Sequence, residues 1–104
     1  MANEVTRRVR AVTRVLRISG TVQGVGYRAA LCRIARGHGV AGWVRNRSDN
    51  TVEALVQGAP DAVEEVIQWA KTGPPAARVL HVQVDTVTEF AAGTHAKFEW
   101  AATE

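Results

Sequence analysis

Cysteine is nearly absent from this sequence of 104 residues, and Cys32 is its only example. A single cysteine excludes an internal disulfide framework, and the lack of a CxxC pair or a Cys/His cluster argues against a zinc site. Long apolar runs are also missing. None approaches the roughly 18 residues of a membrane-spanning helix, and no hydrophobic signal segment opens the chain. We therefore expect a cytoplasmic protein that enters no membrane and holds no structural metal.

A strong charge of either sign is missing too. The 13 lysines and arginines against 10 aspartates and glutamates give a formal net charge of +3. This balance suits anionic ligands and is too mild to indicate nucleic acid by itself. The 46% of hydrophobic residues exclude a disordered chain, and the length suits a single core. Residues 1–11 are polar and basic without periodicity, so we expect a flexible basic tail over 1–11 and one domain over 12–104.

The spacing of apolar residues predicts alternating strands and helices. Tyr27, Ala30, Leu31, Ile34 and Ala35 recur at the positions of one apolar helix face. The glycines that follow this face are expected to end the helix. A second helix is expected over 61–72, and strands are expected over 12–19, 40–46, 52–57 and 79–88, with a short edge strand over 97–100.

Turn residues at 47–51 predict a hairpin between the second and third strands. In the fourth strand, Leu80, Val82 and Val84 alternate with polar residues, which indicates one buried and one exposed face. The order βαββαβ is typical of the α/β (α+β) class. It predicts a ferredoxin-like sandwich, in which two helices cover one face of an antiparallel four- to five-stranded sheet.

The stretch GTVQGVGYR, residues 20–28, joins the first strand to the first helix. Gly24 and Gly26 then lie at the helix N-terminus, where unpaired backbone N–H groups and the helix dipole attract anions. Alternatively, the loop is a plain glycine-rich connector beside a solvated arginine. Arg28 favours the anion site, because a basic residue in the first turn opposes the dipole unless an anion lies beside it. Its guanidinium can also bind two phosphate oxygens at once.

A second motif, GWVRN at residues 42–46, ends in Asn46. The strand end can approach the glycine-rich loop, so this side chain could face the anion. By itself, however, a turn asparagine more often caps its own backbone. We expect His38, His81 and His95 at the surface. Cys32 lies off the main apolar stripe of its helix and is interpreted as structural, not as a nucleophile.

Taken together, GTVQGVGYR, GWVRN, SDNTVE at 48–53 and GPPAARV at 73–79 resemble the acylphosphatase family, over about residues 14 to 100. The resemblance implies hydrolysis of the carboxyl–phosphate anhydride of acyl phosphates without a metal or other cofactor. It implies that Arg28 binds the phosphate and that Asn46 positions the attacking water. The backbone of the loop would cradle the phosphate, at Gln23, Gly24, Val25, Gly26 and Tyr27.

The sequence departs from the family pattern in two places. Tyr27 stands where phenylalanine is frequent, and Asp49-Asn50 stands where Asp-Gly is frequent in the hairpin turn. Asparagine tolerates a positive φ better than most residues, so the turn is expected to form. The expected partners are an acyl phosphate substrate and inorganic phosphate as product and inhibitor, and the protein is expected to be a monomer.

Three alternatives stay open from the sequence. An RNA-recognition module with this fold would stack bases on sheet aromatics, and residues 15–20 and 52–58 contain none. This disfavours a nucleic-acid partner. A partner-binding domain without catalysis is disfavoured by Arg28 and Asn46. An acylphosphatase-like part of a larger carbamoyl-transferring enzyme is disfavoured because the sequence ends after one domain. The three tryptophans, 43, 69 and 100, are interpreted as packing or rim residues.

Overall fold

The computed structural model describes residues 10–104. The tail expected over 1–11 therefore lies almost wholly outside the described residues and stays a prediction. The predicted strands and helices occur in the predicted order, and a short helix that the sequence did not predict lies between the last two strands. They are β1 (Val12–Thr21), α2 (Tyr27–Gly37), β2 (Ala41–Asn46), β3 (Val52–Gly58), α3 (Pro60–Ala70), β4 (Arg78–Thr86), α4 (Glu89–Ala92) and β5 (Phe98–Trp100).

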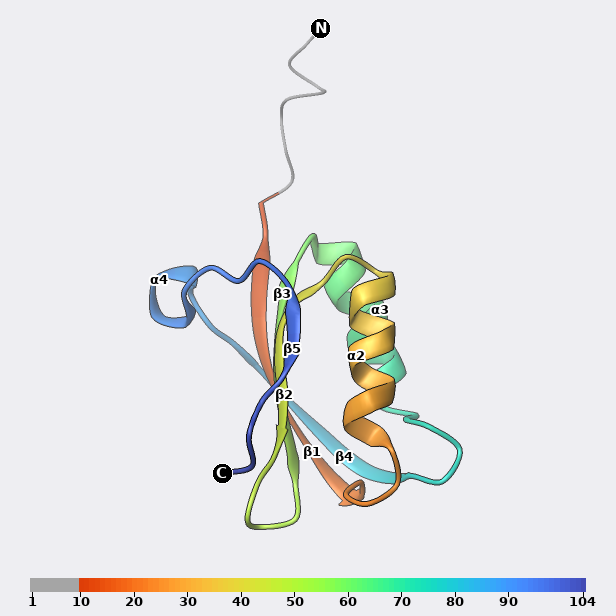
Figure 1. Cartoon of the computed structure of the whole chain (residues 1–104). Coiled ribbons are helices and arrows are strands. Elements are labelled where there is room, and N and C mark those ends of the chain that lie inside the picture. The colour runs from red at the N-terminus through yellow and green to blue at the C-terminus, as the bar shows by residue number, and fades with distance from the viewer. Residues whose placement is uncertain (1–9) are drawn as a thin grey trace, which may run out of the picture.

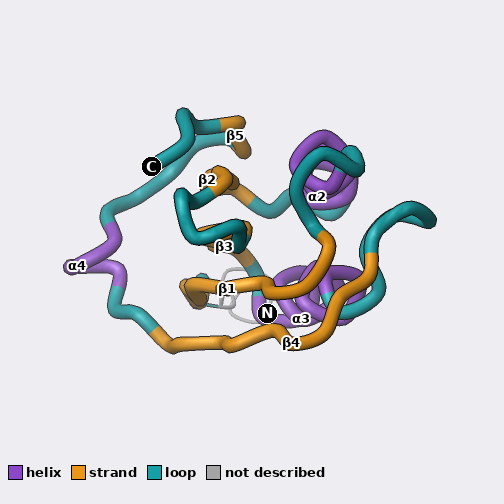
Figure 2. Tube along the Cα trace, turned by 90° about the horizontal axis from the view of Figure 1, so that it is seen from below, coloured by secondary structure: helices purple, strands orange, loops and turns teal. Residues whose placement is uncertain are grey.

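The strands form one sheet in the order β4-β1-β3-β2-β5, and α2 and α3 lie together on one of its faces (Figures 1 and 2). This is the predicted ferredoxin-like sandwich. The predicted purely antiparallel sheet is wrong in one respect, because β5 pairs parallel to β2. The chain leaves the edge strand β4, passes through α4 and reaches the opposite edge, as Figure 2 shows. A chain that crosses the sheet in this way need not return antiparallel to its new neighbour.

Gln57 of β3 fastens this crossover to the sheet. Its side-chain Nε2 donates a hydrogen bond to the Gly93 carbonyl at 2.8 Å, and its Oε1 accepts one from the His95 backbone N–H at 2.9 Å. His95 lies in this loop, as predicted, and is partly exposed. His38 and His81 are exposed, as predicted.

The core lies between the helices and the sheet, and the predicted apolar face of α2 is buried there except for the half-buried Ile34. Cys32 is also buried, with 4% of its surface exposed, so its placement off the apolar stripe was wrong. Because α2 packs against β2, β5 and α3 together, its buried face is broader than one stripe. Burial raises the pKa of the Cys32 thiol, opposed by the nearby Arg36 and Arg28 charges. These features agree with a structural cysteine.

The edge strand β4 departs from its predicted alternation. Leu80 and Val84 are 74% and 41% exposed, whereas Val79 and Val82 are partly buried. A shift in the pairing of β1 with β4 after Ser19 breaks the two-residue period. In addition, α3 packs over β1 and β3, and it leaves the apolar side chains of the edge strand uncovered.

Candidate active site

The loop between β1 and α2 presents uncapped backbone N–H groups. Gly24 and Gly26 have φ values of 75° and 80°, and Gly26 is the N-cap of α2 without any side-chain hydrogen bond to the helix. A Cβ atom at either glycine would meet no heavy atom within 4 Å. It is therefore the positive φ, not crowding, that requires glycine. The first intrahelical bond runs from the Ala30 N–H to the Gly26 carbonyl at 3.1 Å, so the preceding N–H groups lack helical partners.

A cavity of about 240 Å³ opens at this helix terminus. One part of its wall is polar and the other is apolar. Among the described residues it is lined by Val22, Gly24, Gly26, Tyr27, Arg28, Ala29, Asn46 and Trp100. The structure thus brings Arg28 and Asn46, from separate motifs, to one cavity. Of the loop residues expected to cradle phosphate, Gln23 and Val25 are not in this lining.

Asn46 is the last residue of β2 and lies on the same face of the sheet as the buried Val44, two residues before it. Its Oδ1 is buried and accepts no hydrogen bond from any described residue. The structure therefore contradicts the alternative that Asn46 is a turn asparagine whose side-chain oxygen caps its own backbone. A buried acceptor without a donor is unfavourable, so this position suits a ligand or water that donates a hydrogen bond.

Arg28 lies in the first turn of α2, beneath an aromatic ring that the sequence did not connect with it. The carbon at the centre of its guanidinium is 4.8 Å from the ring centroid of Trp100, which is cation–π geometry. In the parallel pairing of β5 with β2, Trp100 is opposite Val44. Trp100 therefore lies on the helix-covered face with Arg28. The interpretation of Trp100 as a rim residue agrees with its 52% exposure.

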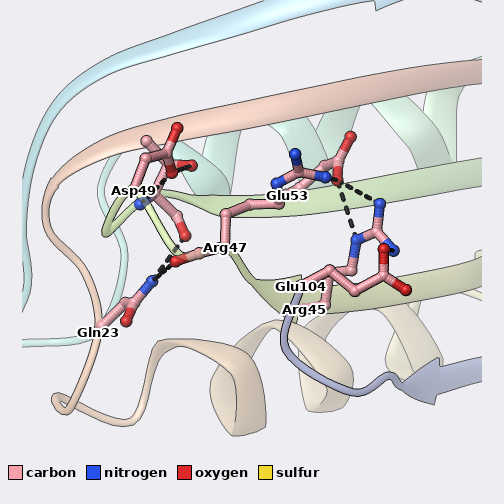
Figure 3. Close-up of polar contacts among 7 residues, drawn as sticks. Gln23, Arg45, Arg47, Asp49, Glu53 and Glu104 are labelled. Atoms are coloured by element: carbon pink, nitrogen blue, oxygen red, sulfur yellow. Dashed lines mark hydrogen bonds and ion pairs between the residues drawn. The ribbon is translucent and has the colours of Figure 1, made fainter.

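Gln23 joins the loop to the hairpin through its side chain. Its Nε2 donates hydrogen bonds to the carbonyls of Arg47 and Thr51, each at 2.8 Å (Figure 3). Arg47 directly follows Asn46, and its backbone N–H donates to the Thr51 carbonyl at the other end of the turn. The sequence indicated only a backbone role for Gln23. The only indication of this contact in the sequence is that a glutamine occurs in a loop that is otherwise poor in functional side chains.

The hairpin has its own polar contacts. The Asp49 carboxylate accepts hydrogen bonds from the Thr51 hydroxyl at 2.6 Å and from the Thr51 backbone N–H at 3.1 Å. These two bonds lower the pKa of Asp49. Asn50 has φ 74°, so the turn forms with asparagine at the position where the family often has glycine, as expected.

Nearby arginines of the hairpin are paired with acids. The Glu53 carboxylate contacts Arg45 at 2.9 Å and Arg47 at 3.0 Å, and Arg45 also contacts Glu104 (Figure 3). Among the described residues lining the cavity, Arg28 is the charged one. The cavity therefore combines a single guanidinium with backbone donors, which suits one small anion.

Within residues 10–104, no group of three or more histidine, cysteine, aspartate or glutamate side chains is placed to hold a metal ion. In the same part of the chain, no helix has the length and apolar character needed to cross a membrane.

Comparisons of the sequence with known proteins point to one family. A model of the acylphosphatase family matches residues 14–99. The chain is 60% identical over 74 residues to an acylphosphatase of Acidovorax sp. (strain JS42), covering 71% of this chain and 76% of that protein. It is 56% identical over 78 residues to an acylphosphatase of Thermococcus kodakarensis, covering 75% and 82% of the two chains.

A solved structure shows the same fold. The acylphosphatase from Coxiella burnetii superposes with a TM-score of 0.82 at 27% identity, over 88% of this chain and 94% of that chain. Sequence and structure therefore agree: the chain belongs to the acylphosphatase family, and its activity is that of an acylphosphatase, the hydrolysis of acyl phosphates.

Proposed function

We propose that the acyl phosphate binds with its phosphoryl group at the N-terminus of α2, between the loop amides and the Arg28 guanidinium, while Asn46 positions the attacking water. One observation carries this proposal: Asn46, whose buried Oδ1 has no hydrogen-bond partner among the described residues, lines the same cavity as Arg28. A water that donates a hydrogen bond to Oδ1 would sit beside an anion held by Arg28. The backbone of residues 23–27, as the family resemblance implies, is included in the proposed cradle.

The chemistry needs little more than these groups. The water oxygen bonds to phosphorus while the bond from phosphorus to the acyl oxygen breaks, and the leaving carboxylate keeps the electron pair. The protons of the water end on the phosphate product. A carboxylate departs without a strong general acid, so positioning and charge stabilisation on the phosphoryl oxygens are the main requirements. Asn46 would supply the first, and Arg28 with the backbone N–H groups the second.

The proposal predicts turnover without a metal ion. We expect hydrolysis of an aryl acyl phosphate to proceed unchanged in EDTA, with inorganic phosphate as a competitive inhibitor, because the product contains the group that the cavity binds. Parallel assays of Arg28→Ala and Asn46→Ala should show little turnover. Activity that disappears on chelation and returns with added metal would contradict the metal-free mechanism.

We further propose that the protein acts as a monomer without a nucleic-acid partner. Arg28 and Asn46, the two side chains to which the proposed chemistry assigns roles, line one cavity of a single chain, so that chemistry requires no residue from a second copy. Sedimentation equilibrium over a wide concentration range tests this, and a stable dimer would contradict it. The cytoplasmic location expected from the sequence stays a prediction.

A further inference from the structure

We propose that Trp100 forms the surface on which the acyl group of the substrate packs, and that the chain therefore favours acyl phosphates with apolar, above all aromatic, acyl groups. This inference rests on the proposed binding of the phosphoryl group at Arg28. Contacts to the phosphoryl group alone cannot distinguish one acyl phosphate from another. Any preference must come from the remaining wall of the cavity.

That remaining wall is apolar. Apart from Arg28, Asn46 and the loop residues, the cavity is lined by Val22, Ala29 and Trp100. On the same measure about 10–15 Å³ holds one water, so a cavity of about 240 Å³ is larger than the four non-hydrogen atoms of a phosphoryl group require. The cavity therefore has room for part of a second group, and the lining residues outside the proposed phosphate cradle are apolar.

Trp100 is exposed although it neighbours the core. Phe98, two residues earlier on the same face of β5, is 1% exposed, whereas Trp100 is 52% exposed. Leu80 and Val84 are the other large apolar residues with marked exposure in the described chain, and neither lines this cavity. An apolar ring uncovered at a binding cavity gains free energy when a ligand covers it.

The position of the ring also fits the shape of the substrate. The Trp100 ring lies over the Arg28 guanidinium, 4.8 Å from its central carbon. A guanidinium can stack its face on a ring while its edge donates to an anion. One bridging oxygen joins the acyl carbon to phosphorus, so a phosphoryl group held at the edge of Arg28 leaves its acyl group within reach of the ring. Aromatic acyl groups gain most from such a contact.

Steady-state kinetics with benzoyl phosphate and acetyl phosphate test the inference. We expect Trp100→Ala to lower the kcat/KM ratio of benzoyl to acetyl phosphate by about tenfold, the usual effect of one missing apolar contact. Trp100→Phe should retain most of the parental ratio. The inhibition constant of inorganic phosphate should stay within about threefold of the parent in both variants, because phosphate has no acyl group.

Trp43 provides a matched control. Its ring stacks on Arg45 with the same separation of 4.8 Å, but Trp43 does not line the cavity. Trp43→Ala should therefore leave the benzoyl-to-acetyl ratio unchanged. Thermal unfolding of each variant checks that the fold is retained.

Two results would overturn the inference. An unchanged substrate ratio in Trp100→Ala would show that the ring does not contact the acyl group. A parallel loss for both substrates, with weaker phosphate inhibition, would show that Trp100 only positions Arg28. Failure of the proposed function looks different, because Arg28→Ala and Asn46→Ala would then keep parental turnover on both substrates.

Discussion

Arg28 lies at a position that is unfavourable for a cation in the folded protein alone. It is in the first turn of α2, which contains no acidic residue, and a positive charge there opposes the helix dipole. Its stack on Trp100 offsets part of this cost. A bound anion would offset the rest. The residue is thus better explained by ligand binding than by stability.

Replacement of Arg28 should therefore affect turnover far more than folding. Arg28→Ala should cost on the order of 2–4 kcal/mol of transition-state stabilisation. Arg28→Lys should be almost as inactive, because an ammonium cannot donate to two phosphoryl oxygens in the planar geometry of a guanidinium. The free energy of unfolding should change by less than about 1 kcal/mol, since relief at the helix terminus offsets the lost stack.

Kinetic assays and urea unfolding of both variants check this prediction. Near-parental turnover in Arg28→Lys would show that only positive charge is needed at this position, and not the guanidinium geometry.

Asn46 should have a different signature, because its proposed partner is water and not the anion. In Asn46→Ala, turnover should fall by a factor on the order of 10² or more, as expected for a lost positioning contact. Affinity for inorganic phosphate should stay close to that of the parent. Folding should be retained, because the Oδ1 atom has no partner to lose within the described chain. Calorimetric titration with phosphate and steady-state kinetics separate the two effects.

Asn46→Asp is the companion variant. It keeps the shape of the side chain but places a negative charge beside an anionic substrate, so both phosphate affinity and turnover should fall. If Asn46→Ala loses as much phosphate affinity as Arg28→Ala, then Asn46 binds the phosphate and the proposed separation of roles is wrong.

At the scale of the elements, the Gln23 side chain joins the loop between β1 and α2 to the β2–β3 hairpin. Its two hydrogen bonds reach the carbonyls of Arg47 and Thr51 in the hairpin turn. Asn46 begins this hairpin and Arg28 follows the loop. The relative position of the two proposed catalytic residues therefore depends on a side chain that is not itself in the cavity lining.

Gln23→Glu tests this connection, because it keeps the size of the side chain and removes the donor. We expect a loss of about 1–3 kcal/mol in the free energy of unfolding, since a carboxylate would face two carbonyl oxygens. Turnover should fall several-fold and phosphate affinity less, because Asn46 would be displaced relative to the loop.

Gln68 offers a matched control for Gln23. Its Nε2 donates a hydrogen bond to Glu64 on the exposed surface of α3, at 2.7 Å, and neither residue lines the cavity. Gln68→Glu should leave turnover unchanged. Parental turnover in Gln23→Glu, measured alongside it, would contradict a positioning role for Gln23.

At the scale of the whole molecule, local pattern predicted most of the architecture. The start of α2 at Tyr27 and the hairpin turn at 47–51 were predicted from periodicity and turn residues, and both are confirmed. The local spacing of apolar residues does not determine how distant segments of the chain pair. For this reason the parallel direction of β5 and the exposure of Leu80 were missed.

The candidate site divides in the same way. Two short motifs identified Arg28 and Asn46, and the fold brings both to one cavity. A motif identifies residue types in one segment, but it does not show which side chains of a distant strand will contact them. The contact of Trp100 with Arg28 depends on the register of β5, and the side-chain contact of Gln23 depends on the approach of the hairpin. Neither could be predicted before the structure.

Tyr27 connects the site with the core of the whole molecule. It begins α2 between Gly26 and Arg28, and its hydroxyl donates a hydrogen bond to the Ala70 carbonyl at 2.7 Å. Ala70 is the last residue of α3, where carbonyls lack helical partners. The ring also lies against Trp69, with centroids 5.5 Å apart. The Tyr27 hydroxyl at the start of α2 thus donates a hydrogen bond to a carbonyl at the end of α3 that has no helical partner.

Tyr27→Phe should lower the free energy of unfolding by about 1–2 kcal/mol at pH 7, because the buried Ala70 carbonyl loses its donor. Turnover should stay within about threefold of the parent, since the backbone N–H at this position is unchanged. Urea unfolding and kinetics at pH 7 measure the two effects.

The same pair of proteins should differ in pH dependence. Burial raises the pKa of Tyr27 well above its usual range. Above about pH 10 the unfolded chain loses the phenol proton while the folded chain keeps it. The stability contributed by this group is therefore complete below pH 10 and is lost as the pH rises toward the folded pKa. Tyr27 is the only tyrosine of the sequence, so the Phe variant removes this titration entirely. The stability difference between the two proteins should narrow from pH 9 to pH 11, and a constant difference would show that the phenol is not held protonated in the core.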